Sequence, residues 1–166
     1  MPDYSRLYLD ADVYLGLIKG ESGRVDIARS LLKDAQQKRF TVVASTLIYA
    51  EVCGHGEVRA ARDAAGVDAK VSAFFEQGFL QWVEVDLVIA RDARRLSRER
   101  RLRGADAIHL ASAVRAGCDV LMTWNKNDFP VGEQVDGVDV REPFLFGQSS
   151  IDELPGPSDG GTRASS

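Results

Sequence analysis

Four short apolar runs alternate with longer helical segments, and this alternation restricts the possible fold more than any other feature. The runs 6–9, 41–44, 80–85 and 119–123 have the length of buried strands. Between them, segments such as 24–38 repeat apolar residues at helical spacing. Strands interleaved with helices form a mostly parallel sheet covered on its faces. The sequence therefore predicts an α/β three-layer sandwich with a central sheet of four to five strands.

The helices are predicted from apolar spacing and from capping residues. Ser45 is a natural N-cap for the helix that follows the second run, and Gly20, Gly78 and Gly117 mark helix ends. Residues 138–140 are expected to add a short edge strand. The expected helices cover 13–20, 24–38, 46–53, 58–65, 69–77, 87–102 and 105–116.

The composition fits one globular domain with a short tail. The chain has 166 residues, of which 45% are hydrophobic, and this is enough for a single core. We expect the domain to cover residues 1–147. Residues 148–166, rich in Pro, Gly and Ser, are expected to be a disordered tail.

Charge and cysteine content exclude several classes of protein. No run approaches the ~20 apolar residues of a membrane span, and no export signal opens the chain, so we expect a cytoplasmic protein. Cys53 and Cys118 lack ligand spacing and are expected to be small buried hydrophobes. The net charge of −4 does not favour nucleic-acid binding, which must therefore depend on local charge.

Four carboxylates follow strands or lie one helix beyond them. They are Asp10, Glu51, Asp106 and Asp128. The carboxyl ends of parallel strands gather along one edge of a sheet, so these acids are expected to converge in one cleft. Converging carboxylates repel one another unless a divalent cation neutralises them, and oxygen ligands select Mg²⁺ or Mn²⁺. The pattern predicts a metal-dependent phosphoryl-transfer site.

Each acid also has an ordinary interpretation. Asp10 or Asp12 would cap the helix they precede, and capping is the expected role of Asp12. Glu51 would project into water, although its helix offers no wide polar face, and Asp106 would complement a helix dipole. His109 shares the face of Asp106 and is expected to orient a neighbour by hydrogen bonding.

Two further features concern ligands and substrate. Thr123 and Asn125 follow the last strand together with Asp128, and Thr123 is suited to hydrogen-bond a ligand carboxylate. Seven arginines lie between residues 91 and 103, against only Asp92 and Glu99. Arginine binds phosphate through two parallel hydrogen bonds, but the same residues also suit a solvated helix face.

The ordered set of motifs resembles PIN-domain ribonucleases of the kind found as VapC-type toxins. The resemblance runs over roughly residues 6–146. It departs from the family at Asp12, where Asn is common, and at Asn125, where Asp is frequent. The motifs are Leu9-Asp10-Ala11-Asp12, Ser45-Thr46 with Glu51, Ala105-Asp106-Ala107-Ile108-His109-Leu110-Ala111, and Leu121-Met122-Thr123-Trp124-Asn125-Lys126-Asn127-Asp128-Phe129.

This resemblance implies an activity, ligands and partners. Asp10, Glu51 and Asp106 would bind Mg²⁺ or Mn²⁺, with Asn125 or Asp128 as a fourth ligand, and the ion would activate water for hydrolysis of RNA. Such toxins form homodimers and are silenced by a cognate antitoxin. Contacts with substrate are expected from Ser45, Thr123, Arg101 and Arg103.

Two alternatives stay open on the sequence. In a phosphatase of the haloacid dehalogenase type, Asp10 would be the nucleophile and Asp12 the acid, but Tyr14 breaks that motif and Glu51 would have no role. A non-catalytic RNA- or protein-binding PIN module would use the same scaffold without needing its acids. Metal-dependent cleavage of RNA separates the three.

Overall fold

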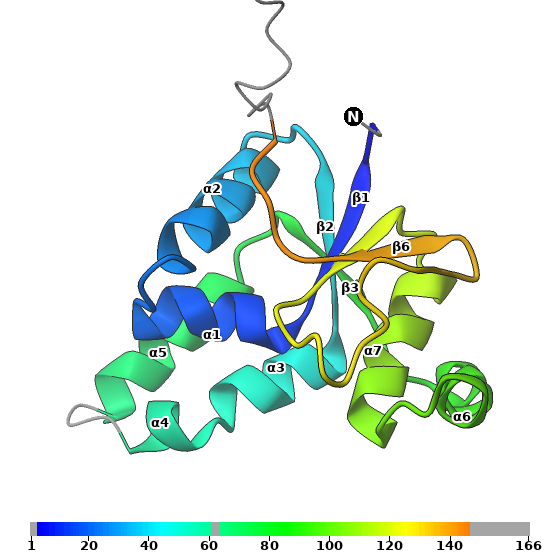
Figure 1. The fold of residues 1–166 in the computed structure, drawn as a ribbon. Helices are drawn as coiled ribbons and strands as arrows, with labels where there is room; N and C mark the ends of the chain where they lie inside the picture. The colour runs from blue at the N-terminus through cyan, green and yellow to red at the C-terminus, as the bar shows by residue number, and fades with distance from the viewer. Residues whose placement is uncertain (1–2, 61–63, 147–166) are drawn as a thin grey trace, which may run out of the picture.

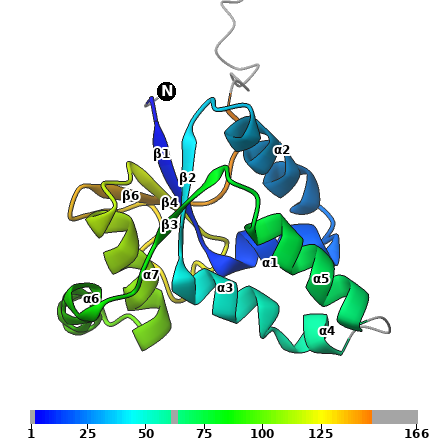
Figure 2. The ribbon, with the colours of Figure 1, turned by 180° about the vertical axis from the view of Figure 1, so that it is seen from behind.

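The computed structural model describes residues 3–60 and 64–146, which form an α/β sandwich. Within these residues the sheet has six strands in the order β3-β2-β1-β4-β6-β5. All neighbouring pairs are parallel except β5 with β6. Helices α1, α2 and α5 lie on one side of the sheet, and α6 and α7 lie on the other (Figures 1 and 2). The predicted fold class is confirmed.

The strands are short, as the apolar runs predicted. They are β1 (Arg6–Leu9), β2 (Thr41–Ser45), β3 (Leu80–Val83), β4 (Val120–Met122), β5 (Gln134–Val135) and β6 (Val138–Arg141). Six strands replace the four to five expected because β5, only two residues long, pairs with β6 across a turn in which Asp136 and Gly137 both have positive φ.

The helices begin and end largely where capping residues predicted. Asp10 caps α1 and Gly20 ends it in the left-handed conformation with φ 65°. Asp86 caps α6 by accepting a hydrogen bond from the Ile89 backbone. The helices are α1 (Ala11–Lys19), α2 (Val25–Gln36), α3 (Thr46–Cys53), α4 (Gly56–Arg59), α5 (Ala64–Phe75), α6 (Leu87–Arg100) and α7 (Gly104–Arg115).

The region after α3 was predicted with the wrong bounds. The stretch 58–65 includes residues 61–63, which lie outside the described part of the chain. Its first two residues belong to α4 and its last two to α5. The stretch 69–77 begins five residues too late, because α5 starts at Ala64 and continues through Gly66. Packing explains this extension: Val67, within the added residues, is partly buried against the hydrophobic core, and Val71, one turn later, is buried in it.

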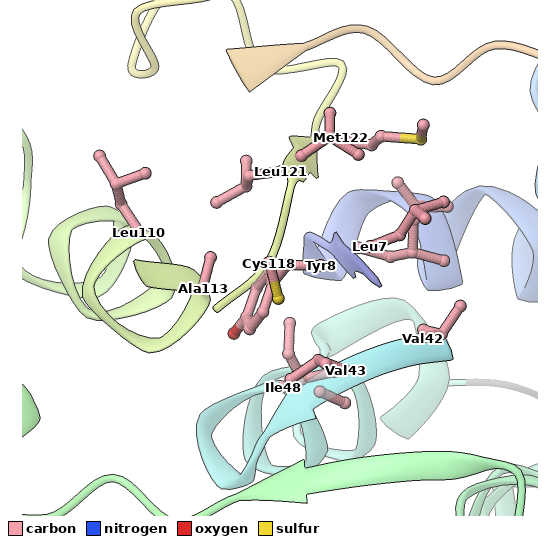
Figure 3. Close-up of a cluster of buried hydrophobic side chains, with 14 of the residues drawn as sticks. Leu7, Tyr8, Val42, Val43, Ile48, Leu110, Ala113, Cys118, Leu121 and Met122 are labelled. Atoms are coloured by element: carbon pink, nitrogen blue, oxygen red, sulfur yellow. The ribbon is translucent and has the colours of Figure 1, made fainter. Parts of the chain in front are cut away.

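Alternate residues of the central strands face opposite helical layers. Tyr8 is in register with Val43 and Leu121, so these side chains share one face of the sheet. Figure 3 shows this face directed toward Leu110 and Ala113 of α7. The central strands are covered on both faces, and their carboxyl ends stay free to carry polar side chains.

Three other expectations bear on the fold. No helix in the described residues is long and apolar enough to cross a membrane. Cys53 and Cys118 are free thiols, Cys118 buried and Cys53 half-buried. The tail predicted from residue 148 lies outside the described residues.

Candidate active site

The predicted acids are brought together at one edge of the sheet. Asp10 directly follows β1, which pairs in parallel with both β2 and β4. Glu51 lies on α3, which begins where β2 ends, and Asp106 lies in the first turn of α7. Asp128 lies in the loop after β4. The parallel connections therefore place four acids, remote in sequence, around the carboxyl ends of neighbouring strands.

Asp10 is the most rigidly held of these acids. Its side chain is 6% exposed, its Oδ1 accepts from the Ala11 backbone at 2.8 Å, and its Oδ2 accepts from the Thr123 hydroxyl at 2.9 Å. The hydrogen bond that was expected from Thr123 to a candidate ligand is confirmed. Burial raises the pKa of Asp10, and the nearby His109 and the Thr123 hydroxyl partly oppose this shift.

His109 holds Glu51 and connects it to the interior. Its Nε2 lies 2.7 Å from Glu51 Oε2 and 3.6 Å from Asp10 Oδ1, and its Nδ1 lies 2.8 Å from the Tyr8 hydroxyl. A carboxylate only accepts hydrogen bonds, so Nε2 carries the proton and donates to Glu51. Burial opposes the charged ring, but the carboxylates of Glu51, Asp10 and Asp106 outweigh it and raise the pKa of His109. The orienting role expected for His109 is confirmed.

Asp106 is half-buried and has no hydrogen-bond partner for its carboxylate among the described residues. Burial and the charges of Asp10 and Asp128 raise its pKa to about 6, while His109 acts in the opposite direction. Acids from separate elements are thus close enough to disfavour one another's ionised form.

Asp12 does not cap α1, so that expectation is wrong. Its Oδ2 accepts from the Trp124 backbone at 2.8 Å, and the Thr123 hydroxyl lies 3.2 Å away. The hydroxyl has one hydrogen, and the nearer Asp10 accepts it. Burial and the charge of Asp10 raise the pKa of Asp12 to about 7, and its buried Oδ1 has no hydrogen-bond partner among the described residues.

The loop after β4 distinguishes between the two candidates for a fourth ligand. Asn125 Nδ2 donates to Asp128 Oδ2 at 2.9 Å, and the Asn125 backbone donates to the Thr123 hydroxyl oxygen at 3.0 Å. Asp128 faces Arg103, whose Nε lies 3.6 Å from Oδ1. The amide of Asn125 thus orients Asp128, and this favours Asp128 as the ligand.

Two expected substrate contacts do not fit the structure. Ser45 and Thr123 are both 0% exposed. Ser45 lies at the N-cap position of α3, but its side chain makes no capping bond and is 2.7 Å from the Tyr8 hydroxyl instead. Both hydroxyls are used inside the protein, so substrate cannot reach them. Arg101 and Arg103 are exposed, and their contact with substrate stays a prediction.

Sequence reasoning missed Tyr8, which connects Ser45 to His109. Tyr8 is 0% exposed, and its pKa is raised well above the ordinary value, chiefly by burial. A buried tyrosine hydroxyl nearly always needs a hydrogen-bond partner, so a tyrosine inside a short buried strand was the available signal. That signal could not identify the partner.

The carboxylate oxygens of these acids are suitable ligands for a divalent cation, but their positions in this structure are not those of a formed metal site. The oxygens are carboxylate oxygens, as Mg²⁺ and Mn²⁺ prefer, and Asp12 Oδ1 is a buried oxygen that no group in the described ranges hydrogen-bonds. However, no three His, Cys, Asp or Glu side chains in ranges 3–60 and 64–146 are grouped closely enough to hold an ion. Asp106 is partly exposed and accepts no hydrogen bond among the described residues, so no hydrogen bond holds it away from Asp10, whereas Glu51 is held by His109.

Comparison with known proteins identifies the class. Residues 7–131 match the family model of the PIN domain, and the chain belongs to this family. Membership of the PIN family excludes the alternative that the chain is a phosphatase of the haloacid dehalogenase type. No curated protein sequence matches the chain.

Solved toxin–antitoxin structures share the fold. The chain is similar to a structure of VapBC2 from Rickettsia felis bound to a promoter DNA fragment, with 14% identity, TM-score 0.62, and coverage of 82% of this chain and 98% of that one. DNA-bound VapBC from Salmonella typhimurium gives 17% identity, TM-score 0.61, and coverage of 83% and 98%. VapC20 from Mycobacterium tuberculosis, a Sarcin-Ricin loop cleaving toxin, gives 15% identity, a TM-score of 0.55, and coverage of 69% of this chain and 86% of that one.

Proposed function

We propose that this protein is a Mg²⁺- or Mn²⁺-dependent endoribonuclease that acts as the VapC-type toxin of a toxin–antitoxin pair. The observation that carries the proposal is the convergence of acids from separate elements. His109 Nε2 lies 2.7 Å from Glu51 Oε2 and 3.6 Å from Asp10 Oδ1, and burial together with the charges of Asp10 and Asp128 raises the pKa of Asp106 to about 6. The fold therefore keeps acids that are remote in sequence close enough to raise one another's pKa, and their repulsion lowers the free energy of unfolding. Such perturbed groups concentrate at functional sites.

The side chains divide into fixed and adjustable groups. Asp10 is fixed by the Ala11 backbone and the Thr123 hydroxyl. Glu51 is held on one oxygen by His109, which leaves its other oxygen for a ligand. Asp106 is unconstrained by hydrogen bonds in the described residues, and Asp128 is oriented by Asn125.

These four acids, Asp10, Glu51, Asp106 and Asp128, would hold the cation. When bound, the cation would neutralise their repulsion, polarise a phosphate group and lower the pKa of water. Fixed carboxylates near that water would orient its attack on the phosphorus atom opposite the leaving 3′ oxygen. The resulting ends would be a 5′-phosphate and a 3′-hydroxyl.

Cleavage of labelled RNA tests this proposal directly. The purified protein is expected to cut RNA internally with Mg²⁺ or Mn²⁺, to stop when EDTA removes the ion, and to recover when the ion is restored. RNA binding without cleavage under any of these ions would instead support a non-catalytic module. An end-group analysis that found a 2′,3′-cyclic phosphate would contradict direct attack by water.

The proposal includes a cytoplasmic location, a cognate antitoxin and a homodimer. An exposed aromatic pair at the edge strand β3 supports the dimer: Tyr49 is 38% and Trp82 is 37% exposed, and their ring centroids are 6.2 Å apart. Unpaired edges with exposed aromatics favour association. Trp82→Glu is expected to shift the sedimentation coefficient from dimer to monomer, whereas Glu142→Gln, at an exposed position after β6 near the other edge of the sheet, should not. A monomeric wild type would refute the dimer.

A further inference from the structure

Helix α6 carries an exposed stripe of arginines that form no ion pair with any acid in the described part of the chain. Arg91, Arg94 and Arg98 are exposed, and their spacing of three and four residues places them along one face of the helix. Together with Arg95 and Glu99 they line a surface hollow of about 330 Å³. A hollow lined by four guanidinium groups and one carboxylate favours an anionic ligand.

The arginines of this helix fall into two groups. Arg95 forms ion pairs with Glu99 and with Asp136 in the β5–β6 turn, and Arg100 pairs with Glu133 at 3.0 Å. In contrast, Arg91, Arg94 and Arg98 have no ion-pair partner among the described residues. Like charges at these spacings repel one another along a helix. The chain as a whole carries −4, so the stripe is a local concentration of positive charge.

The stripe lies on the helix that leads into the acidic site. Helix α6 ends at Arg100, and α7, which packs against it, begins at Gly104 and carries Asp106 in its first turn (Figure 1). Arg103, between the two helices, reaches Asp128. Arg91, Arg94 and Arg98 lie on the side of α6 opposite its buried residues Ile89, Ala93 and Leu96. The stripe covers about 10 Å of helix axis, and the exposed Arg100, Arg101 and Arg103 follow it along the chain toward the acids.

We propose that Arg91, Arg94 and Arg98 form a phosphate-binding track on the outer face of α6, which holds a part of the RNA backbone away from the cleaved bond. This inference rests on the proposed ribonuclease function and names the surface that holds its substrate. Guanidinium groups grip phosphate oxygens with paired hydrogen bonds and do not read bases from this position. The track thus contributes affinity and salt dependence, while the acids carry out hydrolysis.

The test replaces all three arginines by glutamine, an uncharged residue with good helix propensity. The probe is a fluorescein-labelled single-stranded RNA of twenty nucleotides, and its binding is measured by anisotropy in EDTA between 50 and 300 mM KCl. Each phosphate contact contributes about 0.7 to the slope of log affinity against log salt, so the slope is expected to fall by roughly 2. The rate of cleavage at subsaturating RNA in Mg²⁺ is expected to fall in proportion to the lost affinity.

A matched control removes the same charge from other exposed positions, with Arg29, Lys33 and Arg115 replaced by glutamine. This control is expected to change the slope by much less than the α6 variant. Replacement of Arg91, Arg94 and Arg98 by lysine should retain most of the slope, and Arg94→Gln alone should lower it by about 0.7. The single variant keeps the test available if the triple variant does not fold.

The outcomes separate this inference from the function on which it rests. A wild type that cleaves RNA, with an α6 variant whose slope equals that of the control, would overturn the track and leave the nuclease intact. If the wild type binds RNA but never cleaves it, and the α6 variant shows the expected loss of slope, the track is supported and the nuclease is overturned. Absence of any RNA binding by the wild type would overturn both.

Discussion

Asp10→Asn and Asp106→Asn are each expected to lower Mg²⁺-dependent RNA cleavage by at least about 10³-fold, because each removes a charged ligand worth several kcal/mol in the transition state. Asparagine keeps the size of the side chain and removes only the charge. Cleavage of labelled RNA at saturating Mg²⁺ measures the effect. Glu76→Gln, which removes an exposed acid from the end of α5, should leave the rate unchanged.

The same two variants should differ in stability. Asp106 makes no hydrogen bond among the described residues and is repelled by Asp10 and Asp128, so Asp106→Asn should stabilise the metal-free protein. Asp10 accepts two hydrogen bonds, from the Ala11 backbone and Thr123, and the amide of asparagine can replace only one of them. Asp10→Asn should therefore cost about 1 kcal/mol of unfolding free energy. Undiminished cleavage by purified Asp10→Asn would refute the proposed site.

Acidification is the second large effect, and it should stabilise the protein in EDTA. The folded chain holds a proton on Asp12 with a pKa of about 7 and on Asp106 with a pKa of about 6, whereas both titrate near 3.8 when unfolded. As pH falls from 8 to 5, the folded state takes up protons that the unfolded state does not, so stability rises. His109, with its raised pKa, acts in the same direction.

Between pH 8 and pH 5 the free energy of unfolding is expected to rise by about 2 kcal/mol. Asp12 contributes most of this rise, because solvent screens the charge of the more exposed Asp106. The lowered pKa values of Asp119 and Asp139 cost stability only at still lower pH. Urea unfolding at pH 8, 6.5 and 5 measures the gain. Asp106→Asn should be more stable than the wild type at pH 8 and nearly equal to it at pH 5. A wild-type stability that is constant or falls on acidification would contradict the raised pKa values.

Local sequence was sufficient where a feature depends on nearby residues. The strand 6–9 and the helix that ends at Gly20 were placed correctly because apolar runs and left-handed glycine positions act over a few residues. The start of α5 was not, because Gly66 weakens the local helix signal and the first turns of the helix are stabilised by packing of Val67 and Val71 against the core. Tertiary contacts override propensity in such segments.

The amino-acid order by itself determined the α/β fold and which acids belong to one site. Parallel strands joined by helices send Asp10, Glu51, Asp106 and Asp128 to the same edge whatever the side-chain details. Only the tertiary structure decided how each acid is used: Asp12 binds the Trp124 backbone, Thr123 and Ser45 are buried, and Tyr8 supports His109. The reason is physical, since hydrogen bonds are formed between atoms within about 3 Å, and sequence spacing does not fix distances between separate elements.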